Sequence, residues 1–299
     1  VNTNFQLLNY WNVRLNGSYS PQGMSRSATR GGPMMVSPGS TDYSLNVSSD
    51  RRKSVSFGSN FQIKDDRIGT GGSTSVRADV RIQPADNLSL SVSPGWSTST
   101  SDAQYVTSTS TFAYDPTYGR RYLFAELERK SFSMVTRVDW TFTPTLSLQL
   151  YAQPLLSSGD YLEYKQLESA GTYDFLGFDA GSGQALEDGI QCSSTICKID
   201  GQQYVDLDGD GSTDYSFRDR DFNVRSLVGN AVLRWEYRPG STIFLVWQRQ
   251  QFNSALIGDF DFDRDASALF GAPADNRFIV KIPMFRGLGP EVRDLYLGG

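Results

Sequence analysis

The sequence predicts an all-β protein, an antiparallel up-and-down transmembrane β-barrel to which this chain contributes about twelve strands. Three observations lead to that prediction. Apolar and polar residues alternate with a period of two along most of the chain, the expected strands are about ten residues long, and short connections alternate with long ones. Soluble sheets use strands of about five or six residues, so strand length favours a membrane barrel, complete or part of a larger one, over a soluble sandwich.

The clearest alternation is in residues 76–83, where valine, alanine and isoleucine alternate with arginine, aspartate and glutamine. A period of two places these two sets on opposite faces of a strand. In a transmembrane barrel the apolar face meets lipid and the polar face lines the lumen, where opposite charges can pair. The predicted lumen-lining residues are Arg77, Asp79, Arg81, Arg137, Asp139, Arg234 and Glu236. The predicted lipid-facing residues are Val76, Val80, Ile82, Leu88, Leu90, Leu146, Leu148, Leu233 and Trp235.

The barrel is expected to occupy residues 1–285, followed by a polar C-terminal tail over 286–299. Its expected strands are 4–19, 42–49, 53–63, 74–83, 88–97, 104–112, 120–128, 131–142, 145–155, 222–237, 241–252 and 276–284. Short turns are expected at 50–52, 84–87, 115–117, 143–145 and 238–240, and a brief link at 128–130. Longer connections are expected at 20–41, 64–73, 98–103, 156–221 and 253–275.

Aromatic residues support the membrane prediction, because several of them fall near the ends of expected strands. Trp96, Trp140 and Trp235 are examples, and aromatic girdles mark both interfaces of outer-membrane barrels. The alternative is that aromatic residues simply favour β-strands.

Composition excludes several classes of function. The 28 basic residues are outnumbered by 33 acidic ones, which argues against a nucleic-acid partner because phosphate binding needs a basic face. The chain contains no histidine, so Ser–His and Cys–His nucleophiles are excluded. No apolar run reaches the roughly 18 residues of a transmembrane helix. We therefore expect a non-enzymatic protein. The enzymatic alternative is a carboxylate acting in the lumen, such as Asp79 or Asp139 near the arginines there.

The two cysteines, Cys192 and Cys197, lie in the long 156–221 connection and are predicted to form a disulfide. Two free thiols are the alternative. A disulfide indicates an oxidising compartment such as the periplasm or the cell surface.

The same connection contains the sharpest local motif. Asp206, Asp208 and Asp210 occupy the first, third and fifth positions of a loop with glycine at the sixth, and Asp214 occupies the ninth. Alternate carboxylates of this kind converge on Ca²⁺ in calcium loops. The twelfth position is Phe217 in place of the bidentate glutamate, so the loop is not an EF-hand. A calcium-ordered loop and an acidic surface turn both remain open. A second acidic run at residues 259–265 has weaker spacing.

Three stretches carry a resemblance to a known family. They are Thr29-Arg30-Gly31-Gly32-Pro33, residues 141–154 (TFTPTLSLQLYAQP) and residues 233–242 (LRWEYRPGST). They are similar to the DUF5916 family of bacterial outer-membrane proteins, which usually carry an N-terminal family-9 carbohydrate-binding-like domain before a C-terminal barrel. The resemblance implies an outer-membrane location and says little about chemistry.

The resemblance also frames the expected partners, which are outer-membrane lipid, a solute such as an oligosaccharide, and other envelope proteins. The favoured function is solute passage or surface binding. The alternatives are a structural scaffold subunit of an outer-membrane complex and the carboxylate-based enzyme. The family's sugar-binding-like domain and early barrel strands are not in this chain, so we expect the C-terminal part of a larger barrel or a piece that closes with other chains.

Overall fold

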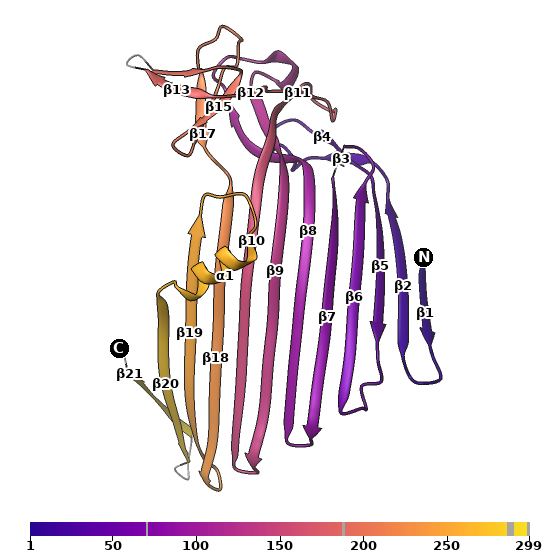
Figure 1. Ribbon diagram of the computed structural model, residues 1–299, viewed down its shortest axis with the longest axis vertical. Coiled ribbons are helices and arrows are strands. Elements are labelled where there is room, and N and C mark those ends of the chain that lie inside the picture. Colours follow the sequence, from indigo (N-terminus) through magenta and orange to yellow (C-terminus); the bar gives the residue numbers. More distant parts are fainter. Residues whose placement is uncertain (70, 187–188, 286–289, 298–299) are drawn as a thin grey trace.

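The computed structural model describes residues 1–69, 71–186, 189–285 and 290–297. Most of the chain forms one large antiparallel sheet of 13 strands, shown face-on in Figure 1. In order across the sheet the strands are β1 (Asn2–Gln6), β2 (Asn12–Ser20), β5 (Ser40–Ser48), β6 (Val55–Asp66), β7 (Gly72–Ala85), β8 (Leu88–Thr109), β9 (Arg121–Thr143), β10 (Leu146–Leu167), β18 (Phe222–Arg238), β19 (Ser241–Ala255), β20 (Ala274–Phe285) and β21 (Pro290–Leu297). The thirteenth, β11 (Phe175–Gly177), pairs with β10. The expected all-β, antiparallel class is confirmed.

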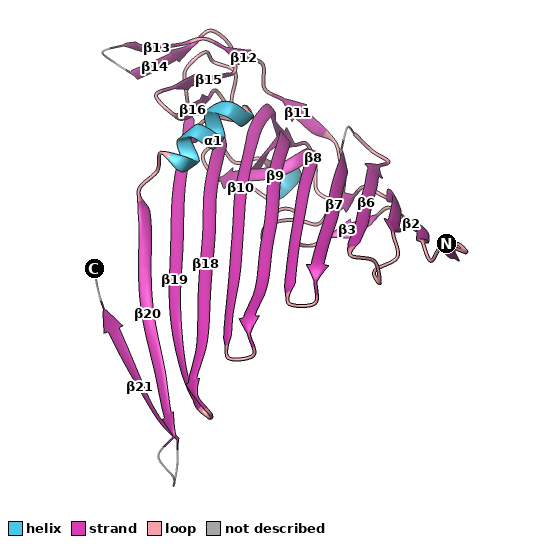
Figure 2. Cartoon of the chain, turned by 60° about the horizontal axis from the view of Figure 1, so that its bottom comes forward, coloured by secondary structure: helices cyan, strands magenta, loops and turns pink. Residues whose placement is uncertain are grey.

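Every strand of this meander pairs with the next one along the sheet, and the short connections lie at one end (Figure 1, bottom). The longest connections all lie at the other end, as predicted, but the β6–β7 connection there spans only residues 67–71 and is no longer than the turn at 49–54. In the described part of the chain the sheet does not close on itself, because β1 and β21 each pair on one side only. Figure 2 shows these two strands at opposite margins of an open sheet.

Two predicted interruptions of the sheet are wrong. The links expected at 98–103 and 128–130 lie inside β8 and β9, where Ser99 pairs with Arg129 and Thr100 pairs with Glu128. At this height both faces of the sheet carry polar residues, so the alternation of hydrophobicity stops while the backbone ladder continues. The turn expected at 115–117 is a 3-10 helix, η1 (Asp115–Thr117), in the long β8–β9 connection.

The predicted strand at 4–19 is instead two strands. The chain reverses between β1 and β2, where the Leu7 amide donates to the Trp11 carbonyl at 2.8 Å. Tyr10 takes the left-handed conformation there (φ 63°), and the Asn9 side chain accepts a hydrogen bond from the Trp11 amide. No glycine or proline marks this reversal, which is why the pattern missed it.

Two expected boundaries between strands and connections also differ in the structure. β10 continues to Leu167, so the long connection begins at residue 168 and not at 156. Residues 290–297, predicted as part of a polar tail, form β21 and pair with β20. The remainder of the predicted tail, 286–289 and 298–299, lies outside the described residues.

Small elements cover the long-connection end of the sheet. A four-stranded sheet consists of β12 (Ala180–Gly181), β15 (Ile196–Ile199), β16 (Gln202–Val205) and β17 (Tyr215–Arg218). The hairpin of β13 (Gly183–Leu186) and β14 (Gly189–Cys192) contacts this small sheet through β15. The hairpin of β3 (Gly23–Ser25) and β4 (Met35–Ser37) packs on the opposite face of β9, where Met35 joins the cluster of Phe124.

The hydrophobic core lies at this same end of the molecule. One cluster joins Leu123 and Ala125 of β9 to Val205 and Phe217 of the small sheet. A second cluster surrounds Phe124 on the opposite face of β9. The continuous apolar run at residues 122–125 is therefore a strand segment buried on both faces, as continuous apolar runs commonly are.

A single α-helix is described, α1 (Phe262–Phe270), in the connection between β19 and β20. The side chain of Asp261 caps its N-terminus by accepting a hydrogen bond from the Arg264 amide at 2.8 Å. In both views α1 lies across β10 and β18 (Figures 1 and 2). No helix in the described residues is long and apolar enough to cross a membrane.

Candidate functional site

The main sheet has one apolar face and one polar face. A single row of paired residues crosses eight strands from β6 to β20 on the apolar face, consisting of Val55, Ile82, Leu90, Val138, Leu150, Ala231, Trp247 and Phe278. All nine residues predicted to face lipid share this face, because the pairing register keeps them in phase. Many side chains of the apolar face are exposed, including Val76 (41%), Trp140 (41%) and Trp235 (49%).

Aromatic rows bound this apolar surface at both ends. Trp140 and Trp235 lie near the short turns, and Trp96 and Phe132 pair with each other farther up the sheet. We call the surface between these rows the apolar band. The eight residue steps from Leu88 to Trp96 correspond to about 27 Å along an extended strand. Beyond Trp96 and Phe132 the same face turns polar, with Thr98 paired to Lys130 and Thr100 to Glu128.

No layer of the described structure covers the apolar band, whose residues are absent from both buried clusters. The chain exposes 18012 Å², although a soluble monomer of its mass, 33.2 kDa, is expected to expose about 12,600 Å². The excess is consistent with an open sheet whose two faces are both largely uncovered.

The opposite face of the sheet is polar, and all seven predicted lumen-lining residues lie on it. Arg234 forms an ion pair with Glu236 at 3.2 Å, and Asp139 accepts a hydrogen bond from Gln149 at 3.2 Å. The Arg137 guanidinium lies over the Tyr151 ring, 5.5 Å from its centroid. The ion pair joins two residues of β18, and the contacts of Asp139 and Arg137 join β9 to their cross-strand neighbours on β10.

A hollow on this polar face lies near the β1 edge of the sheet. Its volume is about 260 Å³, and its lining is rich in amide and charged side chains, including Asn4, Asn12, Arg14, Asn60 and Asp79. Asn60 donates to Asn46 at 2.7 Å on the same face. A wall of amide and charged side chains offers both donors and acceptors to a polar solute.

The two carboxylates considered for catalysis do not form a pair. Asp79 lies on β7 and Asp139 on β9, with β8 between them. Lys198, at the other end of the sheet, forms ion pairs with Asp219 and with Asp221, the latter at 2.8 Å. Asp221 also accepts a hydrogen bond from the Tyr161 amide at 2.9 Å, so this cluster fastens the small sheet to β10. Its chemistry is that of a structural ion-pair network.

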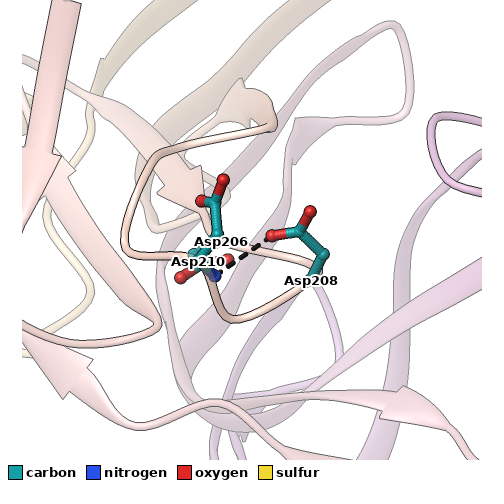
Figure 3. Close-up of side chains that lie close together, drawn as sticks. All are labelled: Asp206, Asp208 and Asp210. Atoms are coloured by element: carbon teal, nitrogen blue, oxygen red, sulfur yellow. Dashed lines mark hydrogen bonds between the residues drawn. The ribbon is translucent and has the colours of Figure 1, made fainter.

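The acidic loop brings three of its four predicted calcium ligands together. Asp206, Asp208 and Asp210 each place a carboxylate oxygen within 4.8 Å of the others, on the single turn shown in Figure 3. Asp206 is buried, and its two oxygens accept from the amides of Gly209 (2.6 Å) and Gly211 (2.9 Å). Hydrogen bonds from Ser212 lower the pKa of Asp210 below its ordinary value.

The fourth predicted ligand, Asp214, has a different place. Its carboxylate accepts a hydrogen bond from the Leu207 amide at 2.7 Å, and its own amide donates to the Val205 carbonyl. Asp214 therefore closes the base of the loop. The loop is ordered by its own carboxylates, and three of them offer oxygen ligands to a hard cation.

The second acidic run is occupied by other contacts. Asp259 and Asp265 form ion pairs with Arg264, and Asp261 caps α1. Three of the four carboxylates in residues 259–265 therefore have partners within the protein, which accounts for this run without a metal.

The predicted disulfide between Cys192 and Cys197 is present, with Cα atoms 5.5 Å apart. Cys192 ends β14 and Cys197 lies in β15, so the bond joins the outer hairpin to the small sheet. The disulfide therefore stabilises the small elements at the long-connection end.

Two features escaped the sequence patterns. Arg225 on β18 and Asp265 on α1 form a buried ion pair at 2.8 Å. The Thr29–Pro33 motif proves to be a packed turn, in which buried Thr29 donates to the Pro33 carbonyl at 2.7 Å. A Cβ at Gly32 would lie 2.3 Å from the Tyr122 ring, so the close approach there requires glycine.

These features define an all-β protein whose main antiparallel sheet is open and has one apolar and one polar face. The chain belongs to the family described as "Domain of unknown function (DUF5916)", whose model matches residues 1–286. This membership confirms the resemblance carried by the three motifs. Comparison with curated proteins finds no match.

Proposed function

We propose that this protein is an outer-membrane β-barrel protein of bacteria, without enzymatic activity, that passes or binds a polar solute. The single observation that carries the proposal is the apolar band bounded by aromatic rows on one face of the sheet. Tilted by about 40°, a strand segment of about 27 Å spans roughly 20 Å along the membrane normal, close to the apolar band of about 25 Å in known barrels.

The alternative of a soluble sandwich needs a second sheet over the apolar face, and none of the described small sheets lies over the apolar band. Lipid acyl chains would cover the apolar band without a second sheet. Closure into a barrel requires partners for the outer edges of β1 and β21, since unpaired backbone groups are costly in hydrocarbon. Those edges could pair with each other or with strands of another copy or of a longer chain.

The polar face would then line the lumen. Its serine, asparagine and charged residues suit the passage of small polar solutes, and a glycan is one candidate class. A scaffold role in a complex of envelope proteins is the second candidate, favoured by the elaborate small sheet and hairpins at the long-connection end, because exposed loops commonly carry binding functions.

The experiment is conductance of the purified chain in planar bilayers, compared between the unmodified protein and two variants with the same change in charge. Arg81→Gln alters the polar face of the sheet, whereas Arg26→Gln alters an exposed arginine in the β3–β4 region. We expect discrete conductance steps whose ion selectivity shifts toward cations in Arg81→Gln and is unchanged in Arg26→Gln. Insertion without conductance would favour the scaffold role, and failure to insert would overturn the membrane proposal.

A second proposal concerns the acidic loop, which we infer binds Ca²⁺ weakly through Asp206, Asp208 and Asp210. The observation that favours it is the convergence of their carboxylate oxygens within 4.8 Å. Bound calcium would relieve the mutual repulsion of these groups and order the loop.

A further inference from the structure

The connection that contains α1 lies on the same face of the sheet as the apolar band, directly beyond the band's upper aromatic row. The Phe260 ring packs edge-on against Trp96 with centroids 4.9 Å apart, and the Phe262 ring packs edge-on against Phe132 at 5.3 Å. Trp96 and Phe132 are the paired residues that end the band. The connection therefore packs against the upper edge of the apolar band.

Buried polar contacts hold this connection to the sheet. Asp265, with no exposed surface, accepts hydrogen bonds from Arg225 Nη2 at 2.8 Å and from Asn223 Nδ2 at 3.0 Å. Gln251 on β19 donates to the Ala272 carbonyl at 2.8 Å. Arg225, Asn223 and Gln251 all belong to the face that carries the band, by the register of β18 with β10 and β19. The helix thus has a fixed position against the outside of this face.

The apolar side of α1 is wider than the part that the sheet covers. Leu269 packs inward and is 1% exposed, whereas Phe262 is 49% exposed and Phe270 is 65% exposed. At 100° per residue, positions 262, 266, 269 and 270 occupy one continuous side of the helix. The apolar side of α1 therefore extends from the sheet, where Phe262 touches Phe132 and keeps half of its surface exposed, to Phe270, which is mostly exposed.

The remaining side of α1 is polar, which distinguishes it from a helix buried in hydrocarbon. Asp263 and Ser267 are exposed, and Arg264 forms an ion pair with Asp259 at 2.9 Å. A short helix with an apolar side, a charged side and exposed phenylalanines is typical of the boundary between headgroups and acyl chains.

We propose that α1 is an interfacial membrane helix: it lies along the outside of the sheet at the level of the lipid headgroups, with Phe262 and Phe270 in contact with lipid. This inference rests on the proposed function, because it takes the apolar band as the lipid-facing surface. Lipid is the occupant because Phe260 on Trp96 and Phe262 on Phe132 extend the apolar band onto the connection that carries the helix. The helix would set the depth at which the sheet sits in the bilayer.

The test uses the full chain in vesicles of phosphatidylethanolamine and phosphatidylglycerol, with a photoreactive side chain at one position at a time. Phe270→p-benzoylphenylalanine reports on α1. Leu245→p-benzoylphenylalanine reports on the apolar band, where Leu245 is paired with Leu233 and Val280, and Trp235 is a second band position. Tyr118, which is 79% exposed beside η1, is the aqueous control.

We expect lipid adducts, measured by mass spectrometry after irradiation, at positions 245 and 270, each several-fold above the level at position 118. Adducts at 245 and 235 without adducts at 270 would overturn the interfacial helix and leave the membrane sheet standing. Adducts at none of the three would overturn the proposed function and the inference together. A crosslink from 270 to a second copy of the chain in place of lipid would also overturn the inference.

Discussion

Arg225 and Asp265 join strand β18 to helix α1 through a buried ion pair, in which the guanidinium Nε and Nη2 donate to one carboxylate oxygen at 3.1 Å and 2.8 Å. The two side chains are 4% and 0% exposed. Arg225 occupies a position of the apolar face, where a lone charge would be unfavourable against lipid. Helix α1 supplies the opposite charge through Asp265 and shields Arg225 from solvent. The helix therefore accounts for a charged residue on the apolar face.

The first prediction follows from that burial. Asp265→Ala leaves the Arg225 charge buried without its partner, and breaking such a pair costs about 3–5 kcal/mol. We expect the free energy of opening of residues 260–270, measured by hydrogen exchange, to fall by that order. Asp263→Ala, an exposed position on the same helix, serves as the control and should change it by less than about 0.5 kcal/mol. Equal effects of the two substitutions would contradict the role assigned to Asp265.

The same pair predicts how α1 depends on pH. Burial opposes ionisation of Asp265, but hydrogen bonds from Arg264, Asn223 and Arg225 outweigh it and hold the pKa below its usual 3.8. A carboxyl whose pKa is lowered by folding contributes stability above its unfolded pKa and loses it as the pH falls through the folded pKa. We expect exchange protection of residues 260–270 to be constant between about pH 5 and 8 and to drop only below 3.8. Loss of protection near neutral pH would be inconsistent with this assignment.

A third prediction separates the two faces of the sheet. Val80 lies in the apolar band, paired with Phe57 and Val92, and its neighbour Asp79 lies on the polar face. If the band faces lipid, Val80→Lys should reduce the free energy of unfolding in vesicles by about 2–4 kcal/mol, as lysine does near a bilayer midplane. Asp79→Lys adds the same side chain one position away and should cost clearly less. Denaturant titration measures both, and equal tolerance would argue against the membrane sheet.

Sequence patterns predicted the two faces well because a period of two is a direct consequence of strand geometry. Val80 and Asp79 could be assigned to opposite faces without any knowledge of their neighbours. The ends of strands were harder. In β8 and β9 the alternation stops above Trp96 and Phe132, where Ser99 and Arg129 still pair across the ladder, so loss of hydrophobic alternation was mistaken for loss of the strand.

The contacts of α1 could not be predicted because they join residues far apart in the chain. Arg225 and Asp265 are 40 residues apart, and neither has a local signature of its partner. The contacts within the acidic loop are local and could be predicted. Asp206, Asp208 and Asp210 lie within one turn, so their spacing sufficed to bring them together, whereas Asp214 was diverted by its hydrogen bond to the Leu207 amide.

The disulfide gives a fourth prediction. Cys192 and Cys197 close a small loop, for which chain entropy predicts a stabilisation of about 2 kcal/mol. Because the bond joins β14 to β15, we expect reduction to raise hydrogen exchange in residues 183–199 and to leave the exchange of β8 and β9 unchanged. Alkylation before reduction should label neither cysteine. Free thiols in the folded, unreduced protein would contradict the bond.

The last prediction concerns calcium and the acidic loop. Three carboxylates converge there, but the twelfth position of the motif is Phe217, which lies buried in the core of the small sheet. Without a bidentate glutamate we expect weak binding, with a Kd of about 10⁻⁴–10⁻³ M, as in extracellular modules. Millimolar calcium should therefore slow proteolysis within residues 200–220, and a chelator should restore it.

Two matched variants make that prediction specific. Asp208→Asn removes one ligand charge from an exposed side chain, whereas Asp200→Asn makes the same change in the β15–β16 turn, outside the ligand group. Asp206 is unsuitable for the test because its carboxylate also holds the amides of Gly209 and Gly211. We expect Asp208→Asn to abolish the protection by calcium and Asp200→Asn to retain it. If calcium leaves the cleavage of the unmodified loop unchanged, the three aspartates serve only to hold the turn.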